Sequence, residues 1–369
     1  MNTSAENTTS DVFQNTTKQN SSFWPMGYTD PSSLPLMHAR LMLRLVVIPI
    51  IICLALFGNS MTVAIIYRLK AKRSTVDQYL IVIAVADTLF ILTSELNIWV
   101  YLVTGVSLVS SNNVMCKLTQ WLIAVTSVSS VWLLVAMTTQ RALSVVWPHR
   151  INVMCTSMTS WRVIAGVVVT SALTYAHALY GIGVNEAEDN GCTIVSPAYF
   201  VFAMEVWTYV DLCLNPFLPF ACILIANVVL VVKLRESLKH ATEQLGAGDS
   251  QHANRSSEAL SVSVTVITVS LSFIVLTAPA VINNLILTWT VFKDPASAQS
   301  FSLEDHLAII FLEAVLNLLR ASNYCLNFYL YCLTGTRFRN EFKKMLCAWR
   351  TADMTQKQRD KMTSKRVCT

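Results

Sequence analysis

The stretch Leu45–Tyr67 reads LVVIPIIICLALFGNSMTVAIIY and contains no charged residue over its 23 positions. About 20 consecutive apolar residues are enough for a helix to cross the hydrocarbon core of a bilayer, so this stretch predicts a membrane span. Similar apolar segments recur along the chain, and the predicted spans are Leu41–Tyr67, Asp77–Val103, Asn113–Val146, Ser160–Ile182, Tyr199–Arg235, Glu258–Thr290 and Leu303–Leu333. The sequence therefore predicts an all-α membrane protein with a bundle of seven transmembrane helices.

The composition favours a membrane protein over a soluble one. Of the 369 residues, 54% are hydrophobic and 13% are charged, whereas soluble domains carry about 25% charged residues. The charged residues also gather between the apolar segments instead of alternating around each helix. The net charge of +5 does not indicate nucleic-acid binding, because Lys and Arg flank the apolar segments and form no basic soluble face.

Residues with catalytic or metal-binding potential are scattered along the chain. The ten cysteines form no C-x-x-C pair and no cluster with histidine, so a zinc site is not expected. No pairing of a nucleophile with a base stands out either. The sequence therefore does not predict an enzyme.

Basic residues predict the orientation of the bundle. One side collects those that follow the first, third, fifth and seventh spans: Arg68, Lys70, Lys72, Arg73, Arg150, Arg162, Lys233, Arg235, Lys239, Arg255, Arg337, Arg339, Lys343 and Lys344. The other side carries far fewer: Lys18, Arg40, Arg44, Lys117 and Lys293. Cytoplasmic loops are the ones enriched in Lys and Arg, so we expect a multi-pass plasma-membrane protein with its N-terminus outside and its C-terminus in the cytoplasm.

Composition also divides the chain into segments. Residues 1–38 are rich in Asn, Ser and Thr and predict a disordered extracellular tail, with glycosylation sequons at Asn2, Asn7, Asn15 and Asn20. The bundle is expected over residues 39–335, with its first span acting as the insertion signal. An amphipathic interfacial helix is expected over 336–348 and a cytoplasmic tail over 349–369. Cys347 is then either a palmitoylation site or a free cytoplasmic thiol.

Polar residues inside the predicted spans are candidates for function, because a charge at mid-membrane costs about 2.5–3.5 kcal/mol. Asp87 lies in the second span, and the seventh carries a stripe on one helical face: Glu313, Asn317, Arg320, Asn323 and Asn327. Such a stripe faces the bundle interior or a water-filled cavity; the alternative is a set of hydrogen bonds that serves packing alone. With Glu95, Glu205 and Asp211, it predicts a polar, net acidic cavity in the extracellular half.

Several motifs occur in a characteristic order: Gly58-Asn59, Ala84-x-x-Asp87, Cys116, Arg141, Pro148, Cys192, Pro219, Pro279, Asn327-Phe-Tyr-Leu-Tyr331 and Phe338. Together they resemble the rhodopsin-like (class A) G-protein-coupled receptors over Leu41–Cys347. The resemblance implies a receptor that binds an extracellular ligand and activates a heterotrimeric G protein. Arrestin, a receptor kinase and membrane lipid are the further partners that it implies.

The resemblance also assigns roles to residues. It implies a disulfide between Cys116 and Cys192. It implies a sodium pocket, so that an allosteric sodium ion is the only expected cofactor, held by Asp87, Ser130, Asn323 and Asn327. It implies that helix six swings out around its proline on activation, and that G-protein coupling involves Arg141, Pro148 and Tyr331.

Some positions depart from the family pattern. Gln140-Arg141-Ala142 stands where the family has Asp-Arg-Tyr, Thr277 and Phe328 replace a tryptophan and a proline, and Val168 lies near the place of the tryptophan in helix four. Losing the acid beside Arg141 removes a charge partner of the resting state. We therefore expect raised basal signalling, which Gln140→Asp should lower.

The ligand is expected to be a peptide. Aminergic receptors have an aspartate at the position of Ile123, and opsins have a lysine at that of Ala321. Thr277-x-Pro279 and the run from Asn327 to Arg339 resemble invertebrate neuropeptide receptors, including those for FMRFamide-like peptides. The expected pocket comprises Glu95, Gln120, Ile123, Asp211, Asn284, Glu313, Asn317 and Arg320.

Other readings of the sequence remain as alternatives. Trp99, Trp121 and Trp207 serve either as aromatic ligand contacts or as anchors at the membrane interface. A receptor for a lipid or another small molecule is the first alternative function. A seven-helix channel or pump is the second. It is disfavoured because the inner half of the bundle offers no carboxylate below Asp87 away from the span ends, where Asp77 and Glu258 are expected at the interface.

Overall fold

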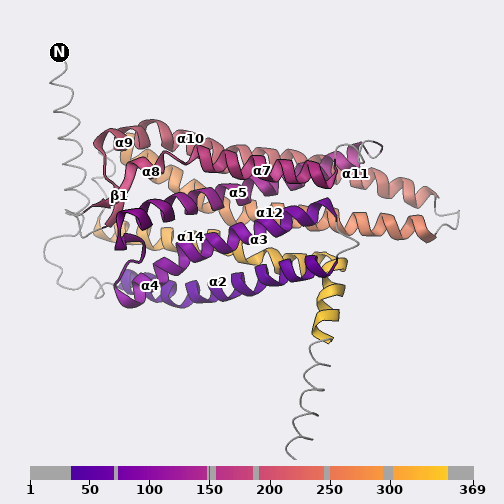
Figure 1. Ribbon diagram of the computed structural model, residues 1–369, viewed down its shortest axis with the longest axis horizontal. Helices are drawn as coiled ribbons and strands as arrows, with labels where there is room; N and C mark the ends of the chain where they lie inside the picture. Colours follow the sequence, from indigo (N-terminus) through magenta and orange to yellow (C-terminus); the bar gives the residue numbers. More distant parts are fainter. Residues whose placement is uncertain are drawn as a thin grey trace, which may run out of the picture.

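The computed structural model describes residues 35–69, 74–147, 149, 155–185, 191–244, 250–293 and 302–347. Within them, seven helical segments are long and apolar enough to cross a membrane, which confirms the predicted fold class. They are Pro35–Arg68, Thr75–Thr104, Asn113–Val146, Ser157–Gly181, Pro197–Glu236, Leu260–Thr288 and Leu303–Thr334. Figure 1 shows them lying along the long axis of the molecule. The sequons at positions 2 to 20, Pro148 and the segment 349–369 fall outside the described residues.

Five of the spans contain one long helix each. These helices are α2 (Pro35–Arg68), α5 (Asn113–Val146), α7 (Ser157–Thr174), α12 (Ser250–Lys293) and α14 (Leu303–Thr334). The fourth span is completed by the short helix α8 (Ala178–Gly181), and α12 continues without interruption through Pro279. Helix α2 begins inside the segment that was predicted as tail, so the bundle starts before residue 39.

The second and fifth spans are divided by π-helical turns. The second consists of α3 (Thr75–Phe90), η3 (Ile91–Glu95) and α4 (Leu96–Thr104). The fifth consists of α9 (Pro197–Phe202), η6 (Ala203–Trp207), α10 (Thr208–Leu212), η7 (Cys213–Phe217) and α11 (Leu218–Gln244). Pro216 lies inside η7, so the irregular turn precedes Pro219, the proline expected to interrupt this helix. A π turn carries an extra residue and is frequent at functional sites.

Side-chain caps define where several helices begin. Ser74 and Asp77 form a reciprocal capping box at the start of α3, and Ser302 and Asp305 form another at the start of α14. At the end of α4, Gly105 has φ +71°, a left-handed conformation that glycine adopts at little cost. These caps satisfy backbone groups that the helices themselves leave without partners.

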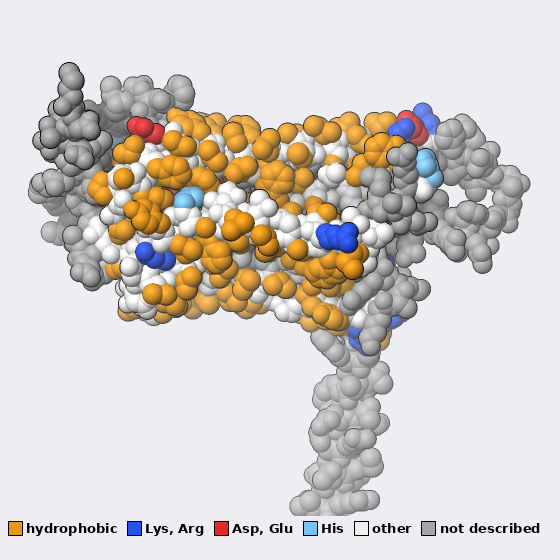
Figure 2. Space-filling view, turned by 45° about the horizontal axis from the view of Figure 1, so that its top comes forward, with side chains coloured by type: hydrophobic (Ala, Val, Ile, Leu, Met, Phe, Trp, Pro, Cys, Tyr) orange, Lys and Arg blue, Asp and Glu red, His pale blue; other side chains and the backbone are white. Residues whose placement is uncertain are grey.

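The sides of the bundle are apolar. Figure 2 shows a broad hydrophobic belt along one face, with charged side chains toward the two ends. Leu173 on α7 is 72% exposed and Ile225 on α11 is 66% exposed. A soluble monomer does not expose so continuous an apolar surface, so the belt is the surface that faces lipid.

Helices α2 and α14 approach closely because Gly58 has no side chain. A Cβ atom at this position would lie 3.1 Å from the Cβ of Phe328. The neighbouring Asn59 donates its amide to the carbonyl of Tyr324 at 3.3 Å. Phe328, which replaces the family's proline, is itself buried. The Gly58-Asn59 motif therefore fixes the contact between the first and seventh spans.

A further helix follows α14 over residues 336–347 and leaves the bundle at a steep angle (Figure 1). Its Phe338 and Met345 are buried, and the ring of Phe338 packs 5.3 Å from that of Tyr331. Leu346 is 39% exposed, and Cys347 is exposed. The short amphipathic helix predicted after the seventh span is therefore present.

Candidate functional site

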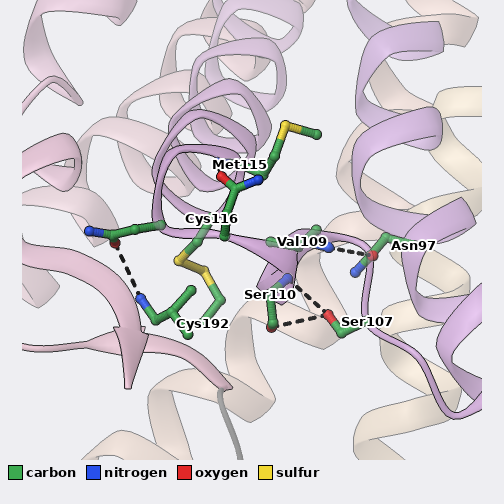
Figure 3. Close-up of a disulfide and its surroundings, with 10 residues drawn as sticks. Asn97, Ser107, Val109, Ser110, Met115, Cys116 and Cys192 are labelled. Carbon is green, nitrogen blue, oxygen red and sulfur yellow. Dashed lines mark hydrogen bonds between the residues drawn. A yellow bond between two sulfur atoms is a disulfide. The ribbon is translucent and has the colours of Figure 1, made fainter. Parts of the chain in front are cut away.

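One end of the bundle is closed by a hairpin and a disulfide. The strands β1 (Ile182–Asn185) and β2 (Gly191–Ile194) pair antiparallel, with Val184 opposite Cys192. Cys192 is bonded to Cys116 near the start of α5 (Figure 3), which confirms the expected pairing. We call this the disulfide end, and the end that carries Arg141 the opposite end.

A cavity of about 300 Å³ lies inside the bundle between α5, α10, η7, α12 and α14. This volume is within the range of small-ligand sites. Three of the predicted pocket residues line it, namely Asp211, Asn284 and Arg320. The other lining side chains are mostly apolar or hydroxyl-bearing: Ser127, Val131, Trp207, Thr208, Tyr209, Leu212, Asn215, Pro216, Phe273, Thr277, Val281, Leu285, Thr288 and Tyr324.

Two opposite charges line this cavity on different helices. Asp211 of α10 accepts a hydrogen bond from the hydroxyl of Tyr175, which leaves its second carboxylate oxygen without a hydrogen bond to the described residues. The charge of Arg320 on α14 attracts both Asp211 and Glu95. Within the described part of the chain, however, the guanidinium of Arg320 forms no hydrogen bond or ion pair. Its donors are therefore available to a ligand that carries a carbonyl or carboxylate.

Hydroxyl and aromatic groups form the deeper part of the cavity. The hydroxyls of Ser127 and Tyr324 lie 2.9 Å apart in a hydrogen bond, and the ring of Tyr324 stacks on Phe90 at 4.0 Å. Thr277 stands where the family has a tryptophan, and its buried hydroxyl has no partner among the described residues. An acceptor or donor group on a ligand can therefore satisfy it.

The expected sodium-pocket residues come together below this cavity. Asp87 is fully buried and accepts hydrogen bonds from Ser130 at 2.5 Å and from the amide of Asn327 at 2.7 Å. Ser130, Asn323 and Asn327 line one small cavity beside it. A buried carboxylate is costly unless it has such partners, so these contacts explain how Asp87 is tolerated inside the bundle.

Arg141 contacts the start of α3 at the opposite end. Its Nη2 donates to the hydroxyl of Ser74 at 2.6 Å. Gln140 turns toward α7 instead and donates its amide to the hydroxyl of Ser160 at 3.2 Å. Tyr331 is buried against the helix 336–347. Both predicted coupling residues in the described chain lie near the end of a helix, Arg141 on α5 and Tyr331 on α14, and Tyr331 also belongs to the core.

A comparison with known proteins decides the family. Residues 58–331 match the family described as 7 transmembrane receptor (rhodopsin family). The chain belongs to this family. The match covers the second to sixth spans completely, the end of the first and nearly all of the seventh, and it includes Asp87, Arg141, the disulfide and the cavity.

The receptor is 27% identical to the somatostatin receptor type 5 of Rattus norvegicus, over 84% of this chain and 79% of the relative. It is 23% identical to the cysteinyl leukotriene receptor 1 of Homo sapiens, over 77% and 79%. It is also 23% identical to the C-C chemokine receptor type 8 of Mus musculus, over 86% and 83%. These relatives are receptors and not enzymes, but they do not single out the invertebrate neuropeptide receptors that the motifs resemble.

Five residues predicted for the ligand pocket of the receptor do not line the cavity: Glu95, Gln120, Ile123, Glu313 and Asn317. Ile123 packs in the apolar cluster between α2, α3 and α14. Glu95 is buried in the turn η3, with its charge attracted first by Arg44. For Glu95 the spacing argument assumed a regular helix, and the π turn in the second span changes the face that this residue occupies.

Glu205 and two of the three tryptophans also lie elsewhere in the receptor. Glu205 is exposed, so it adds no charge to the cavity. The indole of Trp99 donates to the carbonyl of Leu45 at 3.3 Å, and that of Trp121 donates to the carbonyl of Ala172 at 3.0 Å. These two side chains therefore join neighbouring helices.

Sequence reasoning missed three residues that surround Arg141 in the receptor. Ser74 binds it directly, and Asp77 forms an ion pair with Arg337 at 3.2 Å. The signal that could have found the first two is the Ser-x-x-Asp capping box before an apolar run. Sequence spacing gave no sign that Arg337 lies beside Asp77.

Proposed function

We propose that this receptor resides in the plasma membrane, binds an extracellular neuropeptide in the cavity at its disulfide end, and activates a heterotrimeric G protein at its opposite end. The observation that carries the proposal is the pair of opposite charges, Asp211 and Arg320, that lines one cavity of ligand size. A peptide offers both partners, since its cationic groups suit Asp211 and its carbonyls or C-terminus suit Arg320.

Features of the sequence support the proposed orientation of the receptor in the membrane. The four sequons near the N-terminus suit the extracellular side. The helix 336–347 carries Lys343 and Lys344, which suits the cytoplasmic leaflet, where anionic lipids attract basic segments. Cys347 is exposed near the end of this helix and is available for palmitoylation. Arrestin and a receptor kinase would act on this same side.

A lipid ligand is the second candidate, because one relative is named for cysteinyl leukotrienes while others are named for somatostatin and for chemokines. A lipid carboxylate would use Arg320 but would leave the carboxylate of Asp211 without a cationic partner. Leaving a charged group unpaired in a desolvated site weakens binding. The two charges together therefore favour a peptide.

A ligand screen tests the proposal. Cells that express the receptor would be exposed to amidated and free-acid neuropeptides and to carboxylate lipids, with calcium and cyclic-nucleotide readouts. We expect a peptide to evoke a response that is absent from cells expressing an Asp211→Asn, Arg320→Gln double variant at equal surface density. A response to carboxylate lipids alone, unaffected by Asp211→Asn, would support the lipid receptor in place of the peptide receptor.

A sodium effect is a further expected outcome. Carboxylate, hydroxyl and amide oxygens are the ligands that hard cations prefer, and Asp87, Ser130, Asn323 and Asn327 supply such a set. Replacing choline chloride by sodium chloride at constant ionic strength is expected to lower agonist affinity by about 5-fold or more. Asp87→Asn should abolish the difference between the salts, whereas Ser129→Ala, a buried neighbour outside the Asp87 contacts, should retain it. Equal salt effects in both variants would place sodium elsewhere.

A further inference from the structure

Arg141 lacks the acidic neighbour that the family pattern places before it. In its place, Gln140 is held on α7 by Ser160. The guanidinium of Arg141 extends to the start of α3, where its Nη2 donates to the Ser74 hydroxyl at 2.6 Å. The charge of Asp77, one helical turn into α3, also attracts it. Arg141 therefore has partners on a different helix from the one that the family pattern predicts.

The capping box of α3 makes these partners rigid. The Ser74 amide donates to Oδ2 of Asp77 at 2.7 Å, and Asp77 is only 4% exposed. The same Oδ2 lies 3.2 Å from Nη2 of Arg337, whose side chain is 14% exposed. A buried carboxylate that accepts a hydrogen bond on one side and pairs with a guanidinium on the other keeps its position. Ser74 and Asp77 therefore form a fixed acceptor site beside Arg141. Arg337, whose like charge opposes that of Arg141, contributes by fixing the carboxylate of Asp77.

We propose that Ser74 and Asp77, with Asp77 fixed in place by Arg337, hold Arg141 in the resting receptor and take over the restraint of the missing acid at position 140. The inference rests on the proposed coupling of Arg141 to a G protein. It names these three as positioning residues, which act through Arg141. It also removes the reason for expecting raised basal signalling from Gln140 alone, because Arg141 has an alternative restraint.

The residues just before Arg337 also contact α12. Thr336 donates its backbone amide to the Ser261 hydroxyl of α12 at 3.2 Å. Thr334 donates its hydroxyl to that of Thr265 at 3.1 Å. The four residues Thr334 to Arg337 thus contact α12 on one side and Asp77 on the other. An outward movement of α12 would break its contacts with Thr334 and Thr336. Loss of these contacts would weaken the neighbouring pair between Arg337 and Asp77.

The guanidinium of Arg141 has fewer hydrogen bonds than it can make, which suits a contact that must break on activation. Only its Nη2 is hydrogen-bonded within the described chain, and its buried Nε has no partner there. An unsatisfied buried donor raises the energy of the resting arrangement. A competing acceptor, such as a backbone carbonyl of a bound G protein, can therefore draw the guanidinium away from Ser74.

Agonist-free signalling tests the proposal. Asp77→Asn retains an oxygen that can cap α3 but loses the charge, and Arg337→Gln removes the cation. Each is expected to raise basal nucleotide exchange per surface receptor by about 5-fold or more on at least one G protein of a Gs, Gi, Gq and G12 panel. Basal nucleotide exchange of the double variant should not exceed that of either single variant, because both substitutions disrupt one network. Arg337→Lys, which keeps the cation, should recover most of the restraint.

A matched control separates this effect from a general loss of helix charge. Lys344→Gln removes a cation from the same helix whose side chain is 71% exposed and pairs with Glu341, and it should leave basal exchange at the level of the unmodified receptor. A purely structural role for Asp77 and Arg337 would lower thermal stability and surface density in the variants without raising exchange per receptor. That result would overturn the proposal.

A second readout does not depend on the G protein. Nitroxide labels at Met158→Cys on α7 and Val264→Cys on α12 would report the position of α12 by double electron–electron resonance. Cys53, Cys213 and Cys347, which are exposed in the described part of the chain, and Cys368 would first be removed. Asp77→Asn is expected to increase the population with the longer distance. If this population rises while no G protein responds, the proposed restraint of Arg141 is supported and the proposed activation of a G protein is contradicted. An unchanged distance distribution would overturn the restraint.

Discussion

Replacing Arg320 by glutamine is expected to reduce the potency of the agonist peptide by about 30-fold or more, because truncating one partner of a buried charge pair costs about 2–5 kcal/mol. Arg320 lines the cavity and lacks a hydrogen-bond partner among the described residues, so the substitution removes a group that the ligand uses and the fold does not. Surface density should remain unchanged. Concentration–response curves with the peptide from the screen measure the effect.

Two further variants sharpen this prediction. Asp211→Asn should lower potency for a peptide with a cationic group, and it keeps the bond from Tyr175 because the amide oxygen still accepts. Glu313→Gln is the matched control: Glu313 lies on the same helix as Arg320 but does not line the cavity, so potency should stay within about 2-fold, as for substitutions away from a contact. If Arg320→Gln binds the peptide normally, the ligand binds elsewhere.

Removing the disulfide is expected to have the second large effect. The bond between Cys116 and Cys192 closes a loop with a sequence separation of 76 residues, which is worth about 4.5 kcal/mol in the chain-entropy model. The bond also fixes the hairpin β1–β2 beside the start of α5. Cys116→Ser should therefore lower surface receptor several-fold, since even about 1–2 kcal/mol changes cellular abundance.

Flow cytometry with an N-terminal epitope measures this loss, and thermal inactivation of purified receptor measures stability. The double variant Cys116→Ser, Cys192→Ser should resemble the single one, because either change removes the same bond. Cys53→Ser, an exposed thiol on α2, serves as the control and should have no effect. Normal surface density in the double variant would show that the disulfide does not stabilise the receptor.

Hydrophobic runs were sufficient to predict the helices but not their irregular turns. The third span, Asn113–Val146, was predicted without error because polar residues and a cap at Asn112 mark its start. The turns η3, η6 and η7 lie inside apolar sequence, where one extra residue leaves no mark in the hydropathy. Helix α12 begins at Ser250, before its apolar run, because a helix can continue into water after the hydrophobic segment ends.

The candidate site was predictable where a motif spans it. The neighbours of Asp87 and the disulfide both follow from positions shared with a family. The cavity was predictable only in part. The π turn η3 explains why Glu95 lies elsewhere. Which residues of the regular helices α5 and α14 reach the cavity depends on how the helices pack, and sequence spacing does not contain that information. The partners of Arg141 could not be found from spacing, since Ser74 is 67 positions away and the contact depends on how the helices pack.

A receptor that works as proposed must have its disulfide end outside the cell and its helix 336–347 on the cytoplasmic side. Epitope tags at the two termini, detected by antibody on living cells, test this requirement most directly. We expect the amino-terminal tag to be labelled on intact cells and the carboxyl-terminal tag to be labelled only after the plasma membrane is permeabilised. Labelling of the carboxyl-terminal tag on intact cells would contradict this orientation.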